Sequence, residues 1–136
     1  MKTISPIELQ KILAAQPDAP VIDVRTPVEF GEVHIPQARS IPLDELKPAT
    51  IGLSKDQPVY LLCRSGQRAT RAAEKFAKEG FIQPIVVEGG TLAWIAANLP
   101  VTRGTTKVIS LERLIHEIAS SDILRDNIFQ VIFGTI

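Results

Sequence analysis

The stretch that decides the fold reads Pro58-Val-Tyr-Leu-Leu-Cys63-Arg-Ser-Gly-Gln-Arg68, and a second stretch continues it as far as Gly80. Its first part, Val59 to Leu62, is a short apolar run after a proline, which is typical of a strand buried on both faces. From Ala69 onward the apolar residues recur at helical spacing, and Gly80 stands where a C-terminal cap is expected. We therefore predict a buried strand, a six-residue turn and an amphipathic helix.

The only cysteine of the chain, Cys63, falls at the carboxyl end of this strand and directly before the helix. Ligands of α/β sheets bind beyond the carboxyl ends of the strands, and the unpaired N–H groups of a helix N-terminus stabilise an anion. Arg64 and Arg68 add positive charge, and Gly66 lets backbone N–H groups curl inward. These features favour a thiolate at Cys63. The alternative is a small buried hydrophobic residue, which is the usual fate of a lone cysteine.

Strands and helices alternate along the rest of the chain. Ser5-Pro-Ile-Glu8 and Thr26-Pro-Val-Glu29 have the pattern of a capping box with proline at the first helical position. Short links between alternating elements predict an α/β fold with a parallel five-stranded sheet flanked by helices on both faces. The strands are expected at residues 3–4, 19–24, 39–41, 59–62 and 82–87, and the helices at 6–13, 27–33, 69–79 and 91–98.

Charge and composition exclude several classes of function. Fifteen basic and fifteen acidic side chains cancel, so we expect no nucleic-acid partner. One cysteine and two separated histidines, His34 and His116, form no metal-ligand pattern, so we expect no metal and no cofactor. The N-terminus has no apolar signal segment, and a single working thiol suits a reducing compartment. We therefore expect a cytoplasmic protein.

We expect the main domain at residues 1–103 and a helical tail at 104–136. Two short amphipathic helices can form in this tail, but helices of that length are not stable alone. Their apolar faces must pack on the domain, on a partner chain or on a membrane. The apolar run 128–136 is about half as long as a bilayer span requires. We therefore prefer self-association as a homodimer, with partner docking or a shortened membrane anchor as alternatives.

Four motifs in the expected order resemble the rhodanese (sulfurtransferase) superfamily over residues 3–102. The loop matches the form C-R-x-G-x-R, in which a cysteine begins an anion-binding turn. The motifs are Val21-Ile-Asp-Val-Arg25 with Glu29-Phe30, His34-Ile-Pro-Gln-Ala-Arg-Ser-Ile-Pro42, Cys63-Arg-Ser-Gly-Gln-Arg68 and Glu88-Gly-Gly-Thr-Leu-Ala-Trp94.

The resemblance implies a rhodanese-like fold and a thiosulfate sulfurtransferase. Cys63 would take a sulfane sulfur from an anionic donor such as thiosulfate or a polysulfide, and would pass it to a thiol, cyanide or protein acceptor. The backbone N–H groups of the loop would hold the persulfide anion. Arg64 and Arg68 would bind the donor. The residues that line the turn between these arginines are Ser65, Gly66 and Gln67.

Two residues at the end of the second strand are expected to support the loop. If the strand order follows the family, Asp23 accepts hydrogen bonds from the loop and Arg25 pairs with Glu29 or Glu32. His34 is expected to be a hydrogen-bonded structural histidine. Trp94 is expected to pack in the core or against the sheet.

Two other functions use the same features. Phosphatases of the cell-cycle dual-specificity class share this fold and loop position, but their arginine follows the cysteine by six residues. Arg68 follows Cys63 by five, which makes a tighter cradle, sized for sulfur rather than phosphate, and disfavours a phosphatase or an arsenate reductase. The second alternative is a non-enzymatic interaction module or persulfide carrier. Inactive relatives usually lack the cysteine, so the intact loop disfavours a purely binding role.

Overall fold

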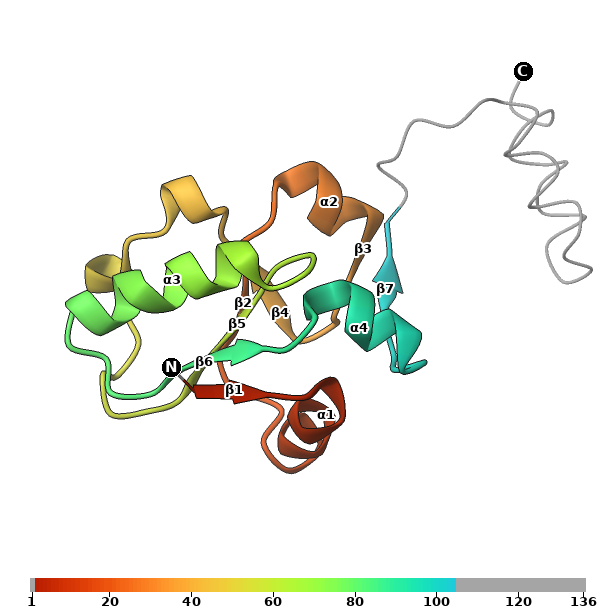
Figure 1. The fold of residues 1–136 in the computed structure, drawn as a ribbon, viewed down its shortest axis with the longest axis horizontal. Helices are drawn as coiled ribbons and strands as arrows, with labels where there is room; N and C mark the ends of the chain where they lie inside the picture. The colour runs from red at the N-terminus through yellow and green to blue at the C-terminus, as the bar shows by residue number, and fades with distance from the viewer. Residues whose placement is uncertain (1, 105–136) are drawn as a thin grey trace, which may run out of the picture. The chain divides into compact units, whose positions relative to one another are not determined.

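Five parallel strands form one sheet, and helices cover both of its faces (Figure 1). The computed structural model describes residues 2–104. The strand order is β1-β6-β5-β2-β4, and every pairing is parallel, which confirms the predicted sheet. The strands are Lys2–Ile4 (β1), Val21–Asp23 (β2), Ala38–Ser40 (β4), Val59–Leu62 (β5) and Pro84–Val87 (β6).

Short-range capping contacts set the beginnings of the first two helices. The Ser5 side chain accepts the N–H of Glu8, and the Thr26 side chain accepts the N–H of Glu29. Both predicted capping boxes are therefore confirmed, because each carboxylate also accepts the N–H of its own N-cap residue. The helices are Pro6–Ala15 (α1), Pro27–Glu32 (α2), Gln67–Lys78 (α3) and Gly90–Ala96 (α4), with 3₁₀ turns at Leu43–Glu45 (η1) and Pro48–Thr50 (η2).

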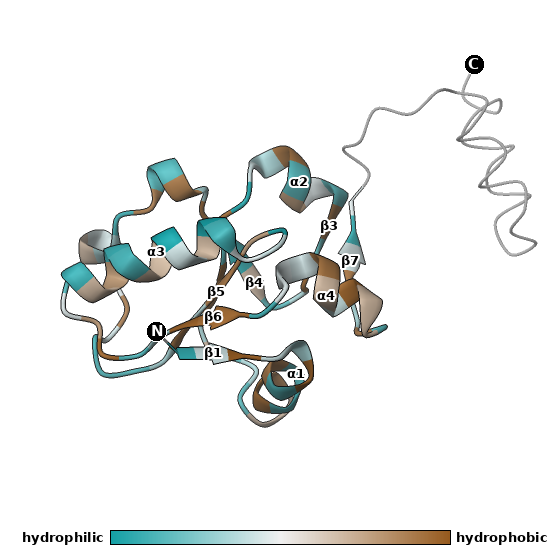
Figure 2. Cartoon of the chain, viewed as in Figure 1, coloured by the Kyte–Doolittle hydropathy of each residue, from teal (hydrophilic) through white to brown (hydrophobic). Residues whose placement is uncertain are grey.

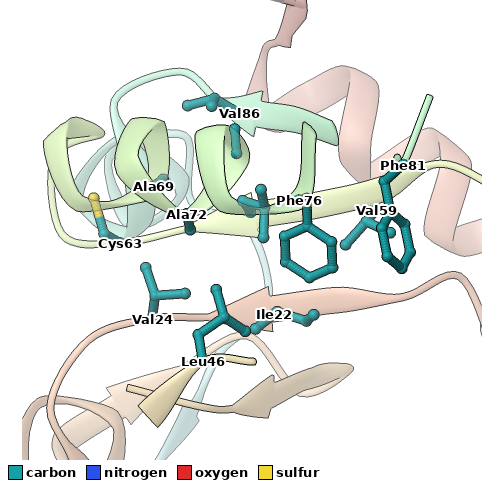
Figure 3. Close-up of a cluster of buried hydrophobic side chains, with 12 residues drawn as sticks. Ile22, Val24, Leu46, Val59, Cys63, Ala69, Ala72, Phe76, Phe81 and Val86 are labelled. Atoms are coloured by element: carbon teal, nitrogen blue, oxygen red, sulfur yellow. The ribbon is translucent and has the colours of Figure 1, made fainter. Parts of the chain in front are cut away.

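Helix α3 packs on one face of the sheet through small residues. Ala69, Ala72 and Ala73 are fully buried, and their short side chains let the helix lie close to β5 and β6. Figure 3 shows Ala69 and Ala72 in this cluster. Phe76 fills the end of this cluster and meets Phe81 edge to face, with ring centroids 4.8 Å apart. Strands β5 and β6, covered on both faces, are apolar along their length (Figure 2).

Helices α1 and α4 cover the opposite face. Leu9 and Leu13 of α1 and Trp94 of α4 belong to one buried cluster, in which Trp94 is fully enclosed. The indole Nε1 of Trp94 donates a hydrogen bond to the carbonyl of Pro100 at 2.8 Å, which satisfies the one polar atom of the ring. The prediction that Trp94 is a core residue is confirmed.

The register of the central strands brings two segments together at one edge of the sheet. Asp23 pairs with Leu62 across the parallel ladder of β2 and β5. Since both strands run in the same direction, the residues that follow them leave the sheet side by side. Cys63 and Arg25 therefore lie at the same carboxyl edge, where ligands of α/β sheets bind.

Several predicted boundaries shift by one or two residues, and two differences from the prediction bear on the site. Helix α3 begins at Gln67, so Gln67 and Arg68 belong to its first turn rather than to the preceding loop. A small antiparallel pair of strands, Val33–His34 (β3) with Thr102–Arg103 (β7), had no signal in the sequence. The tail predicted for 104–136, with its homodimer or membrane role, lies outside the described residues apart from Gly104. Among residues 2–104, no helix is long and apolar enough to cross a membrane.

Candidate active site

The sulfur of Cys63 lies at the beginning of α3. Its Sγ accepts the backbone N–H of Gly66 at 2.9 Å, and Gly66 is the N-cap residue of that helix. Gly66 has a φ of 119°, a conformation that L side chains rarely adopt. The space around Gly66 is open, so its backbone conformation, rather than crowding, favours glycine here. The loop therefore turns an amide hydrogen toward the sulfur.

Cys63 is also nearly enclosed. It is 1% exposed and belongs to the apolar cluster beneath α3, as the alternative of a buried hydrophobic residue expects (Figure 3). The hydrogen bond from Gly66 distinguishes it from an ordinary core cysteine, because the sulfur is an acceptor for the loop. Any molecule that is to react with this sulfur has to enter the loop, because the side chain is almost fully enclosed.

Arg68 is held in a two-point ion pair with Glu29 of α2. Its Nη1 donates to Oε1 of Glu29 at 2.7 Å and its Nη2 donates to Oε2 at 2.9 Å. The hydrogen bond from Arg68 is the largest cause that lowers the pKa of Glu29 to about 2, and the N–H of Thr26 adds to it. The same contact raises the pKa of Arg68. The pair fastens the start of α3 to α2.

Arg64 remains available to an anion. Its side chain is exposed and forms no ion pair within residues 2–104. It lines a pocket of about 240 Å³ beside the loop. The side chains of Ser65 and Gln67 are exposed as well, so the loop presents polar groups to solvent around the buried sulfur. The other residues that line this pocket are Arg25, Glu29, Glu32, Val33, Thr91, Leu92 and Ile95.

The predicted partners of Asp23 and Arg25 are wrong. Arg25 Nη2 donates to Asp23 at 2.7 Å and Arg25 Nε donates at 2.9 Å, whereas Glu29 pairs with Arg68. Residues two apart in an extended segment point to the same side, so the arginine folds back onto the nearest carboxylate. Asp23 is 0% exposed and accepts from Arg25 rather than from the loop. Arg25 Nη2 also donates to the carbonyl of Val33 at 2.7 Å, which connects β2 to β3.

His34 has a structural role, as predicted. Its Nδ1 lies 2.7 Å from the carbonyl oxygen of Phe30. Its ring stacks on the Phe30 ring with centroids 3.9 Å apart and an angle of 8° between the planes. Both contacts hold the end of α2. Residues 2–104 contain no group of three histidine, cysteine or acidic side chains placed to bind a metal.

Sequence reasoning missed two residues that contact the loop. Glu29 was expected to cap its own helix and was one of two predicted partners of Arg25, but its contact with Arg68 was not predicted. Thr91 was passed over, although its N–H and hydroxyl both reach the carbonyl of Cys63. Two sequence features could have drawn attention to these residues. Glu29 is the acidic residue of the second capping box, and Thr91 directly follows two glycines.

Comparison with known proteins agrees with this architecture. The rhodanese-like domain family model matches residues 5–97. An uncharacterized protein of Synechocystis is 37% identical over 123 residues, which cover 90% of this chain and 68% of that protein. A sulfurtransferase of Allochromatium vinosum is 31% identical over 93 residues, covering 68% of this chain and 87% of that protein. The crystal structure of a rhodanese-related protein from Thermoplasma volcanium is 29% identical with a TM-score of 0.64, and the match covers 75% of this chain and 98% of that one. This chain therefore belongs to the rhodanese-like domain family.

Proposed function

We propose that this protein is a sulfurtransferase that moves a sulfane sulfur from a small anionic donor, such as thiosulfate or a polysulfide, to an acceptor through a persulfide on Cys63. One observation carries the proposal: the Cys63 sulfur accepts the Gly66 N–H at the beginning of α3. Membership of the rhodanese-like family and similarity to a protein named sulfurtransferase support it.

In the first step the Cys63 thiolate attacks the outer sulfur of thiosulfate. The S–S bond of thiosulfate breaks, and its electron pair leaves with sulfite. The product is a persulfide on Cys63, whose terminal sulfur carries the negative charge. Amide hydrogens of the loop and the N-terminus of α3 stabilise this charge. No general base is required once the thiolate has formed.

In the second step an acceptor nucleophile attacks the terminal sulfur of the persulfide. The bond between the two sulfur atoms breaks, and its electron pair returns to Cys63 as the thiolate. Cyanide becomes thiocyanate, and an acceptor thiolate, free or on a protein, becomes a persulfide. The two displacements balance without an external oxidant or reductant. A reducing compartment such as the cytoplasm suits this single working thiol.

Both arginines contribute to donor binding in this proposal. Arg64 is exposed beside the loop and can donate to the oxygens of an anionic donor. Arg68 adds positive charge, but Glu29 neutralises part of it. We therefore assign the larger share of donor binding to Arg64. Ser65, Gly66 and Gln67 form the wall of the loop between the two arginines.

Mass spectrometry of the protein treated with thiosulfate tests the proposal. We expect the intact mass to rise by one sulfur atom on Cys63, and we expect cyanide to remove that atom as thiocyanate. Cys63→Ser should show neither change. A native thiol that stays unmodified by both thiosulfate and polysulfide would instead indicate a binding module. Turnover of an aryl phosphate that is lost in Cys63→Ser would indicate a phosphatase.

A further inference from the structure

The first turn of α4 is capped by the carbonyls of the active loop. The N–H of Thr91 donates to the carbonyl of Cys63 at 2.8 Å, and the hydroxyl of Thr91 donates to the same oxygen at 3.2 Å. The N–H of Leu92 donates to the carbonyl of Arg64 at 3.2 Å. The N-cap residue of α4, Gly89, has no side chain to satisfy these helix donors. The loop itself takes the place of a capping side chain.

These contacts determine which way the loop amides face. In a trans peptide the carbonyl of one residue and the N–H of the next point in opposite directions, and the described chain has no cis peptide bond. Since the carbonyls of Cys63 and Arg64 point to α4, the N–H groups of Arg64 and Ser65 point away from it. Helix α4 packs on one face of the sheet, whereas the Cys63 side chain lies in the cluster on the other face. The amide hydrogens are therefore turned toward the side of the sulfur.

Gly90 permits the close approach of α4 to the loop. It has a φ of 58°. A Cβ at this position would lie 2.3 Å from the carbonyl oxygen of Cys63 and 2.6 Å from that of Arg64, closer than such atoms can approach. Thr91 is 1% exposed, so its hydroxyl requires a buried partner, and that partner is the Cys63 carbonyl. Both residues are thus adapted to hold the loop backbone.

We propose that Thr91, with Gly90, is a positioning residue that orients the loop amides toward the Cys63 sulfur. An effect of Thr91 on sulfur transfer rests on the proposed function. An effect of Thr91 on the reactivity of the Cys63 thiol does not depend on that function. The test therefore measures the rate at which iodoacetamide alkylates Cys63 across a pH series, because this reaction needs no sulfur donor. Thermal unfolding of each variant reports separately on stability.

The hydroxyl is tested with Thr91→Val, which keeps the shape of the side chain, and with Thr91→Ser, which keeps the hydroxyl. We expect Thr91→Val to slow alkylation about threefold to tenfold near neutral pH, as loss of one hydrogen bond predicts. The pH at half-maximal rate should rise, and Thr91→Ser should react like the native protein. Thr50→Val is the matched control, because it removes an exposed threonine hydroxyl bonded to the Lys47 carbonyl, outside the loop and α4.

The glycine is tested with Gly90→Ala, which should slow alkylation more than Thr91→Val does. Its control is Gly52→Ala, since Gly52 has a φ of 80° but open space around it. If Thr91→Val lowers only the melting temperature and its alkylation profile superimposes on the native one, the inference is wrong. This conclusion from alkylation holds whether or not the native protein accepts sulfur from thiosulfate. If only the sulfur assay fails, the proposed function is wrong and the inference about Thr91 is not affected.

Discussion

Arg68 and Glu29 are 39 residues apart in the chain, yet their side chains meet in two parallel hydrogen bonds of 2.7 and 2.9 Å. The same carboxylate accepts the N–H of Thr26 and so completes the capping box of α2. One side chain therefore stabilises the beginning of α2 and fastens the first turn of α3. Together with Thr91 on the other side, it holds the loop of Cys63 at both ends.

Glu29→Gln is expected to lower the KM for thiosulfate about twofold to fivefold, because it removes a negative charge that competes with the donor for Arg68. The free energy of unfolding should fall by about 0.5–1 kcal/mol, as is usual for a partly exposed ion pair. Steady-state kinetics and urea unfolding measure the two effects. Glu32→Gln is the control, since Glu32 lines the same pocket but forms no ion pair within residues 2–104. If Glu29→Gln and Glu32→Gln lower the KM equally, the cause is the change in net charge near the pocket and not the release of Arg68 from Glu29.

Acid should weaken the fold through Glu29. Its pKa is lowered from 4.5 to about 2, so its stabilising contribution is complete above pH 4.5 and is lost as the pH falls toward 2. In that window the urea midpoint of the native protein should fall more steeply than that of Glu29→Gln. Some acid sensitivity should remain, because the hydrogen bond to the Ser5 N–H also lowers the pKa of Glu8. Parallel curves for the two proteins would contradict the assignment to Glu29.

Arg64→Gln is expected to raise the KM for thiosulfate about tenfold without lowering the melting temperature. The first effect follows from loss of a charge-assisted hydrogen bond to the donor. The second follows because Arg64 is exposed and unpaired within the described chain. Arg71→Gln removes an exposed arginine from α3 and should leave the KM unchanged. If both variants raise the KM alike, the arginines act through long-range attraction rather than contact.

Arg25→Met is expected to lower the free energy of unfolding by about 3–5 kcal/mol, because it leaves a buried carboxylate without its partner. Asp23 is 0% exposed and the Arg25 side chain 4%, so water does not replace the lost contact. The double variant Asp23→Leu with Arg25→Met should recover most of the loss. Arg39→Met, at an exposed position on neighbouring β4, should change stability by less than about 0.5 kcal/mol. Urea unfolding of the native protein, Asp23→Leu, Arg25→Met and the double variant gives the coupling energy between Asp23 and Arg25.

Features that depend on neighbouring residues could be predicted from the sequence. Both capping boxes join residues three apart, and such contacts form where Ser or Thr at the N-cap is followed three residues later by Glu. The apolar run Val59–Leu62 is buried at every position, as its composition indicates. The start of α3 was placed too late, because Gln67 and Arg68 are polar and carry no periodic apolar signal. The left-handed conformation of Gly66 determines that start.

The sequence by itself determined the order of the main strands and helices, the parallel sheet and the place of Cys63 between a buried strand and a helix. These follow from hydrophobic periodicity and local turn chemistry, which act over a few residues. Only the tertiary structure decided which residues distant in the chain meet: Arg68 with Glu29, and Thr91 with the Cys63 carbonyl. A hydrogen bond requires its two atoms within about 3 Å, and for residues distant in the chain that proximity depends on how the strands are ordered and how the helices pack against them.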